Sequence, residues 1–179
     1  SYNRPIFLRQ CIISLEKAGL NKNQIFVLDN GSDQKLMKEL KIEFKNRVQW
    51  FDNEKNVGFA NNFSKIFSVS DAKYLMALHD DDIIFNNTLP VLLSILEKNS
   101  KSDILSCNGF KVNDENVVSN IEILERENKN DLLVFENSSE FASHIFDNSC
   151  VPFSPIIFRN SSVKKHALKM VDYEKKYAQ

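Results

Sequence analysis

The 179-residue chain carries 23 Lys and Arg residues against 24 Asp and Glu residues, a formal net charge of −1. This balance, without a long basic run, gives no support to nucleic-acid binding through a broad electrostatic footprint. Four Gly and four Pro exclude a low-complexity chain. The length fits one domain over residues 1–179.

The three cysteines, Cys11, Cys107 and Cys150, are far apart, odd in number and surrounded by apolar residues. We expect free thiols in a reducing cytosol rather than disulfides or zinc ligands. No apolar run approaches the roughly 18–20 residues that span a bilayer, and no signal peptide is recognised. We therefore expect a cytoplasmic protein, with peripheral contact at the inner face of the membrane left open.

The first half of the chain alternates amphipathic helices with short apolar strands. In chain order these are helix 5–18, strand 25–28, helix 34–44, strand 48–51, helix 60–69, strand 73–79, a helix from Thr88 and strand 103–107. Pro5 suits a first helical turn, Gly19 a helix end, and Thr88 a helix cap. Leu36, Met37 and Leu40 are expected to face inward. The alternation predicts a three-layer α/β fold with a mostly parallel sheet.

The second half is less regular. The expected elements are a hairpin over 110–118, a strand over 132–135, a helix over 138–146 capped by Ser139, a strand over 155–158 and a helix over 162–170.

Three consecutive acids, Asp80, Asp81 and Asp82, directly follow an apolar strand, and apolar residues resume at Ile83. An extended backbone would direct Asp80 and Asp82 to one side and Asp81 to the other. Desolvation and mutual repulsion penalise such charges, and Mg²⁺ or Mn²⁺ would relieve both penalties. The alternative is a solvated acidic turn.

Asp29 also follows an apolar strand, 25–28. Ligands of parallel α/β sheets bind at the carboxyl ends of the strands, so Asp29 and the acids at 80–82 are expected at one edge. A metal held by few protein ligands usually completes its shell with phosphate oxygens. A phosphorylated ligand or a nucleotide is therefore expected.

Four segments carry a family likeness: Ser1–Pro5, Val27–Ser32, Asn56–Phe59 and His79–Ile83. In order and spacing they resemble the T-Y-N-R, V-D-[DN]-G-S, N-x-G and D-x-D elements of the family 2 glycosyltransferases of the GT-A fold. The resemblance covers nearly the whole chain. It implies nucleotide contacts for Ser1, Tyr2, Asn3, Asp29, Asn62, Asp80 and Asp81, and ligation of Mn²⁺ or Mg²⁺ by Asp82 and Asp80.

Asn62 stands near the place where many relatives carry an Arg, and this difference leaves one nucleotide contact unassigned. Its other expected role is to cap helix 60–69. His79 could ligate the metal, although an extended strand would point it away from Asp80. Arg159 is expected to form a structural ion pair or to face a phosphate.

The resemblance implies transfer of a sugar from a nucleoside-diphosphate sugar, most simply a UDP-sugar, to a glycan or lipid-linked acceptor. Inversion at the anomeric carbon and a place in bacterial surface-polysaccharide synthesis are implied as well. The expected catalytic base lies beyond Gln179, with Glu136 or Glu140 as a remote substitute, and the family's first strand is expected before Ser1.

Two other functions stay open. A nucleotide-sugar-binding module would keep the pocket without catalysis. A metal-dependent nucleotidyltransferase would use the same acids, but no GxxxxGK[ST] loop is present.

Overall fold

A computed structural model describes residues 1–113, 118–122, 132–148 and 154–162. It divides into two compact units, of which one holds Ser1–Leu105 and the described residues from Ile157 onward, and the other holds Ser106–Ile156. The second unit is thus inserted in the sequence between two segments of the first. A single domain over residues 1–179 stays a prediction.

The first helix, α1, spans Pro5–Lys17 and confirms the expected start and end. Arg4 occupies the N-cap position and Pro5 the first helical position, where its missing N–H costs nothing. The chain leaves the helix at Gly19, whose φ of +92° suits a residue without a Cβ. Leu8, Cys11 and Ile12 form the buried face, so the helix must pack against other elements.

Strands β1 (Phe26–Asp29) and β2 (Gln49–Asp52) pair in parallel, with Phe26 opposite Gln49 and Asp29 opposite Asp52. Parallel neighbours require a crossover, and helix α2 (Gln34–Glu43) supplies it. The Asp33 carboxylate begins α2 by accepting hydrogen bonds from the backbone N–H groups of Lys35 and Leu36. The predicted parallel α/β connection is therefore confirmed for this part of the chain.

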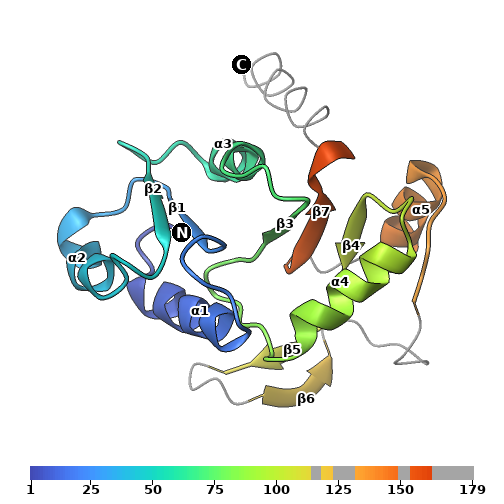
Figure 1. Ribbon diagram of the computed structural model, residues 1–179, viewed down its shortest axis with the longest axis horizontal. Coiled ribbons are helices and arrows are strands. Elements are labelled where there is room, and N and C mark those ends of the chain that lie inside the picture. Colours follow the sequence, from blue (N-terminus) through green and yellow to red (C-terminus); the bar gives the residue numbers. More distant parts are fainter. Residues whose placement is uncertain (114–117, 123–131, 149–153, 163–179) are drawn as a thin grey trace. The chain divides into compact units, whose positions relative to one another are not determined.

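The core of this region combines α1, α2, β1 and the residues that lead into β2. Its buried members are Leu8, Ile12, Ile25, Val27, Met37, Leu40, Phe44 and Val48. Figure 1 shows α1 below β1 and α3 above it. The inward prediction holds for Met37 and Leu40 and is wrong for Leu36, which is 49% exposed. One residue turns a helix by about 100°, which carries Leu36 off the buried face.

The remaining elements of the first unit begin with α3 (Phe59–Ser64), continued by a 3₁₀ turn over Lys65–Ser68. They continue with β3 (Tyr74–Ala77), α4 (Thr88–Lys98), β4 (Ile104–Ser106) and β7 (Ile156–Arg159). Thr88 is the first helical residue of α4 rather than its cap, and the N-cap residue Asn87 makes no side-chain capping bond. The capping prediction for Thr88 is therefore wrong by one position.

The second unit contains β5 (Phe110–Val112) and β6 (Val118–Glu122), which pair antiparallel and confirm the predicted hairpin. Helix α5 spans Ser138–Asn148. Its cap is Asn137 rather than Ser139, because the Asn137 Oδ1 accepts the N–H groups of Ser139 and Glu140. The segment 132–135 forms no strand. The predicted helix 162–170 falls largely outside the described residues.

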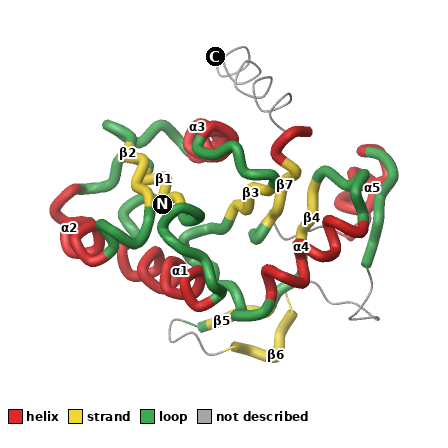
Figure 2. The backbone as a smooth tube through the Cα atoms, viewed as in Figure 1, coloured by secondary structure: helices red, strands yellow, loops and turns green. Residues whose placement is uncertain are grey.

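The described strands form three small sheets, ordered β1-β2, β3-β7-β4 and β5-β6 (Figure 2). The α/β character is confirmed, but the expected continuous sheet is divided, because β1 and β3 are edge strands of different sheets. None of the helices in the described part of the chain has the length and apolar character that a membrane crossing requires.

Candidate functional site

A cavity of about 970 Å³ lies between the edge strands β1 and β3, whose residues line it on both sides. Apolar side chains such as Val27, Leu75 and Ala77 form much of its wall. Its polar lining includes Ser1, Tyr2, Arg4, Asn30, Asn62, His79, Asp80 and Asp81. The structure thus brings Ser1, Tyr2, Asn62, Asp80 and Asp81 to one cavity, whereas Asn3, Asp29 and Asp82 do not line it.

Ser1 is held against the free edge of β1 (Figure 2). Its backbone nitrogen donates to the Leu28 carbonyl at 2.9 Å, and its carbonyl accepts from the Asn30 N–H at 2.8 Å. These two bonds are the pattern of a parallel ladder opposite Asp29. The buried Ser1 Oγ has no hydrogen-bond partner among the described residues, so this hydroxyl can serve a ligand in the cavity.

Asp29 is fully buried at the end of β1. Its Oδ1 accepts the Ser32 N–H at 3.0 Å, and its Oδ2 lies 3.0 Å from the Lys41 Nζ. Burial alone would raise the pKa of Asp29, but the hydrogen bonds from Ser32 and Lys41 outweigh it and hold the pKa below its usual value. Both oxygens are engaged inside the protein, and the nucleotide contact of Asp29 stays a prediction.

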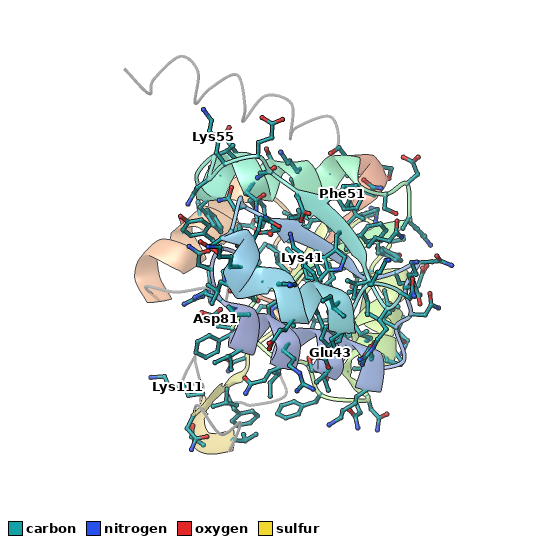
Figure 3. All side chains as sticks on the ribbon, turned by 90° about the vertical axis from the view of Figure 1, so that its left-hand side faces the viewer. Lys41, Glu43, Phe51, Lys55, Asp81 and Lys111 are labelled. Atoms are coloured by element: carbon teal, nitrogen blue, oxygen red, sulfur yellow. The ribbon has the colours of Figure 1, made fainter. Side chains whose placement is uncertain are left out.

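Lys41, labelled in Figure 3, projects from α2 toward the strands. Its Nζ also lies 3.0 Å from Asp52 Oδ1 and 5.5 Å from the centre of the Trp50 ring. One cation thus joins the ends of β1 and β2. It also neutralises a carboxylate that would otherwise be buried without a counter-charge.

Asn3 has a φ of +56°, a region that Asn tolerates better than most residues. Its side-chain oxygen accepts the Asp33 N–H and its backbone N–H donates to the Ser32 hydroxyl, each at 2.8 Å. These bonds fasten the start of the chain to the loop between β1 and α2. A nucleotide contact for Asn3 stays a prediction.

Asn62 lies within α3, and its amide group donates to the Leu28 carbonyl at 3.2 Å. Its oxygen accepts from the Asn53 amide at 2.9 Å, and Asn53 donates in turn to Asn30. The capping alternative is wrong, because Gly58 occupies the N-cap position of α3. Asn62 therefore joins an amide network in the cavity wall.

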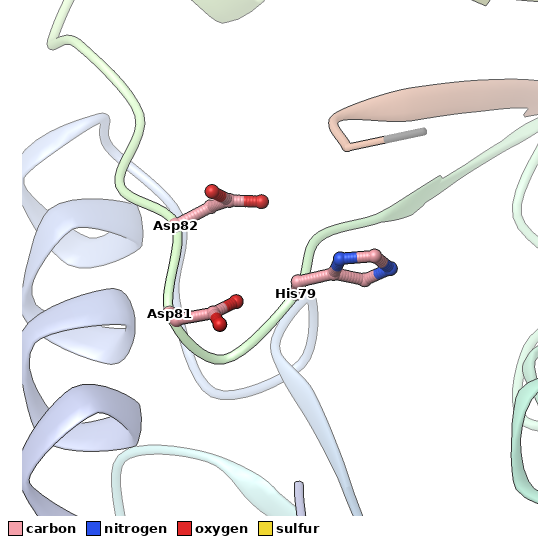
Figure 4. A group of neighbouring side chains, drawn as sticks. All are labelled: His79, Asp81 and Asp82. Atoms are coloured by element: carbon pink, nitrogen blue, oxygen red, sulfur yellow. The ribbon is translucent and has the colours of Figure 1, made fainter. Parts of the chain in front are cut away.

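The three acids lie in a turn that follows β3 rather than in a continued strand. The Asp82 N–H donates to the His79 carbonyl at 3.2 Å, which closes the turn. The expected alternation, with Asp80 and Asp82 on one side, is therefore wrong. Asp81 and Asp82 instead direct their carboxylates toward the side on which His79 lies (Figure 4).

One ligand atom from each of His79, Asp81 and Asp82 lies within 4.8 Å of the others. Imidazole nitrogen and carboxylate oxygen are donors that suit Mn²⁺. The neighbouring Asp80 Oδ2 is buried and makes no hydrogen bond to a described residue. These residues fit a divalent cation. The group includes the predicted ligand Asp82. It also includes His79, which an extended strand would have pointed away from Asp80.

Arg4 was not singled out in the sequence, although it belongs to the first family-like segment. Its Nη1 lies 3.0 Å from Asp80 Oδ1 and 2.8 Å from Asp81 Oδ2. Hydrogen bonds to Asp81 and then to Asp80 raise the pKa of Arg4, so the guanidinium stays charged. The predicted metal ligand Asp80 therefore faces an arginine with one of its oxygens.

Arg159 has a structural role that rests on hydrogen bonds. Its guanidinium donates to the carbonyls of Ser102 and Leu96 and to the Tyr74 hydroxyl. Among the described residues it forms no ion pair, so the expected ion pair is wrong, whereas a phosphate contact stays a prediction. Glu140 is engaged at the start of α5, where its carboxylate accepts from the Glu136 N–H and the Asn137 amide.

Residues 1–158 match the model of Glycosyl transferase family 2. The chain therefore belongs to family 2 of the glycosyltransferases, as the sequence motifs predict. It is 30% identical over 100 residues to an "Uncharacterized glycosyltransferase" of Rickettsia bellii (strain RML369-C), a match that covers 55% of this chain and 14% of the relative.

The fold resembles that of S. aureus TarS, residues 1–349, solved in complex with UDP. The TM-score is 0.62 at 18% sequence identity, and the match covers 93% of this chain and 46% of the TarS chain. The chain thus spans less than half the length of both proteins.

Proposed function

We propose that this chain binds the donor of a glycosyltransferase that moves a sugar from a UDP-sugar to a glycan or lipid-linked acceptor. The observation that carries the proposal is the gathering of Ser1, Asp80 and Asp81 around one cavity at the carboxyl ends of β1 and β3. Family membership supports the reaction class. The UDP named for the TarS crystal supports a uracil nucleotide.

In this proposal Ser1, Tyr2 and Asn62 face the nucleoside. Asp82, with Asp81 and His79, would hold Mn²⁺ or Mg²⁺, and the remaining oxygen of Asp80 lies beside this group. A metal there would supply Lewis-acid stabilisation of the departing diphosphate. Asp29, fixed by Lys41, keeps the turn that carries Asn30 and Ser32 in place, and we retain it as a candidate contact to the base.

We further propose that the fold is that of the GT-A glycosyltransferases, with one mostly parallel sheet. We also propose that the transfer inverts the anomeric carbon. The proposed setting is the cytoplasmic side of the inner membrane face, in bacterial surface-polysaccharide synthesis. These proposals rest on the family likeness. Inversion needs a carboxylate base that deprotonates the acceptor hydroxyl.

A second candidate is a nucleotide-sugar-binding module without catalysis. It is favoured by one observation: in the described part of the cavity lining, the carboxylates are Asp80 and Asp81, which Arg4 already engages. A nucleotidyltransferase is disfavoured by the family match.

Calorimetric titration with UDP, CDP, ADP and GDP in the presence of Mn²⁺ tests the donor. Preferential binding of UDP supports the proposal, and equal or absent binding contradicts it. Hydrolysis of a UDP-sugar by a longer form of the protein would favour the transferase over the binding module, which binds the same nucleotide without turnover.

A further inference from the structure

The proposed ligand is strongly anionic, yet the cavity offers few positive charges. Among the Lys and Arg side chains of the described residues, only those of Arg4 and Lys73 line it. The Lys73 Nζ is engaged by Glu97 Oε1 at 2.6 Å, in a pair whose side chains are 61% and 54% exposed. Arg4 is therefore the cation beside the acids of the site.

Arg4 uses only part of its hydrogen-bonding capacity. Both bonds to Asp80 and Asp81 come from Nη1, and Nε and Nη2 make no hydrogen bond to a described residue. The side chain is 47% exposed, and its Cζ lies 5.6 Å from the centre of the Phe7 ring. The Nε–Nη2 edge of a guanidinium is the fork that binds phosphate oxygens in a bidentate manner.

We propose that Arg4 binds the diphosphate of the donor through its Nε–Nη2 edge, while Asp80 and Asp81 hold Nη1 in position. This inference rests on the proposed function. It assigns to Arg4 the positively charged nucleotide contact that the neutral side chain of Asn62 cannot supply. Because the guanidinium is already fixed by two carboxylates, less side-chain freedom is lost on binding.

The three acids have different neighbours. Asp80 Oδ1 accepts a hydrogen bond from Arg4, and Asp82 belongs to the proposed metal group. Asp81 both pairs with Arg4 and belongs to the metal group. Asp80 is thus a positioning residue for Arg4, and its loss should weaken diphosphate binding even when no metal is present.

The test is a set of metal-free titrations of the full chain with UDP by calorimetry and with uridine by NMR chemical shifts. The variants are Arg4→Gln, Arg4→Lys and Asp80→Asn. Arg9→Gln is the matched control, because Arg9 lies in the helix that begins directly after Arg4, pairs with the exposed Glu43 and does not line the cavity.

Arg4→Gln is expected to weaken UDP binding about ten- to hundredfold, the usual effect of losing charge-assisted hydrogen bonds, and to leave uridine binding unchanged. The UDP affinity of Arg4→Lys should lie between those of the wild type and Arg4→Gln. Asp80→Asn should weaken UDP binding but not uridine binding. Arg9→Gln should bind both ligands as the wild type does. Mn²⁺ binding without nucleotide should be kept or strengthened in Arg4→Gln, which also shows that the variant is folded.

Wild-type affinity for UDP in Arg4→Gln would overturn the inference and leave the proposed function standing. An equal loss for UDP and uridine would overturn it as well, since Arg4 would then act on the shape of the site. Failure of the wild-type chain to bind UDP both without metal and with Mn²⁺ would overturn the proposed function, and this inference with it.

Discussion

The Lys41 Nζ lies 3.0 Å from the Oδ2 of Asp29, a carboxylate with no exposure to solvent. The pair joins the last turn of α2 to the end of β1. Since Asp29 also holds the Ser32 N–H, the ion pair supports the loop that fixes Ser1 and Asn3.

Lys41→Met should destabilise the protein by about 2–4 kcal/mol near neutral pH, because it leaves a buried carboxylate without its counter-charge. Urea unfolding measures the change. Lys73→Met is the control and should have a much smaller effect, because both partners of the Lys73–Glu97 pair stay hydrated. Equal losses in the two variants would contradict the structural role of Lys41.

The same pair predicts a pH dependence. The folded-state pKa of Asp29 is lowered from 3.8, so its stabilising contribution is present above that value and is lost as the pH falls through the folded pKa. In Lys41→Met, burial without a cation should raise the pKa of Asp29, and acid should then stabilise the variant relative to the wild type. The difference in unfolding free energy should therefore narrow between about pH 7 and about pH 3. A constant difference would refute this.

Gly31 and Gly19 form a matched pair for backbone strain. Both have positive φ, +76° and +92°, so Ala should cost about 1 kcal/mol at either position. A Cβ at Gly31 would also come within 2.7 Å of the Asn56 backbone nitrogen, whereas nothing lies within 4 Å at Gly19. Gly31→Ala should therefore lose about 3 kcal/mol or more. Equal losses in urea unfolding would show that the loop at Lys55 and Asn56 yields freely.

Asp82→Asn should weaken Mn²⁺ binding without nucleotide about tenfold or more, since a neutral amide oxygen is a weaker ligand than a carboxylate. Electron paramagnetic resonance measures free and bound Mn²⁺. Asp103→Asn, which removes an exposed carboxylate elsewhere in the first unit, should have no effect. Unchanged Mn²⁺ binding in Asp82→Asn would remove this residue from the proposed metal group.

Cys11 should be unreactive toward thiol reagents in the native protein. Burial, followed by the charges of Asp80 and Asp82, raises the pKa of its thiol to about 12, and the reactive thiolate is therefore scarce at neutral pH. In a Cys107→Ser/Cys150→Ser variant, Ellman's reagent should label Cys11 only after denaturant is added. Rapid labelling of the native variant would contradict the burial of Cys11.

The sequence predicts α1, β1, α2 and β2 because their periodicity agrees with their burial. Pro5 and Gly19 also mark the ends of α1 through local backbone chemistry. The strand predicted over 132–135 is not formed, because an apolar run becomes a strand only where a neighbouring strand pairs with it. The side chains of Leu132–Val134 are instead 44–56% exposed. The observed N-cap lies one position before Thr88 in α4 and two positions before Ser139 in α5. Neighbouring polar residues can also cap a helix, so the sequence alone does not select between them.

The sequence predicts which edge of the fold carries the site, at the carboxyl ends of the strands. It does not predict which site residues contact one another. The family-like segments place Ser1 and the acids together, and the cavity includes them. The contact of Arg4 with Asp80 joins residues 76 positions apart, and no local pattern signals it. Nor does periodicity show that a turn, closed by Asp82 and His79, replaces the strand and turns Asp81 toward Asp82.

In the proposed function, the acids of the turn after β3 bind a divalent cation and, through it, a nucleoside diphosphate. The sharpest test is calorimetric titration of the chain with UDP, without metal and with saturating Mn²⁺. Because coupled ligands raise each other's affinity, UDP should bind more tightly with Mn²⁺ than without it, and Asp82→Asn should abolish the difference. Identical UDP affinity with and without Mn²⁺, or no binding in either case, would contradict the account.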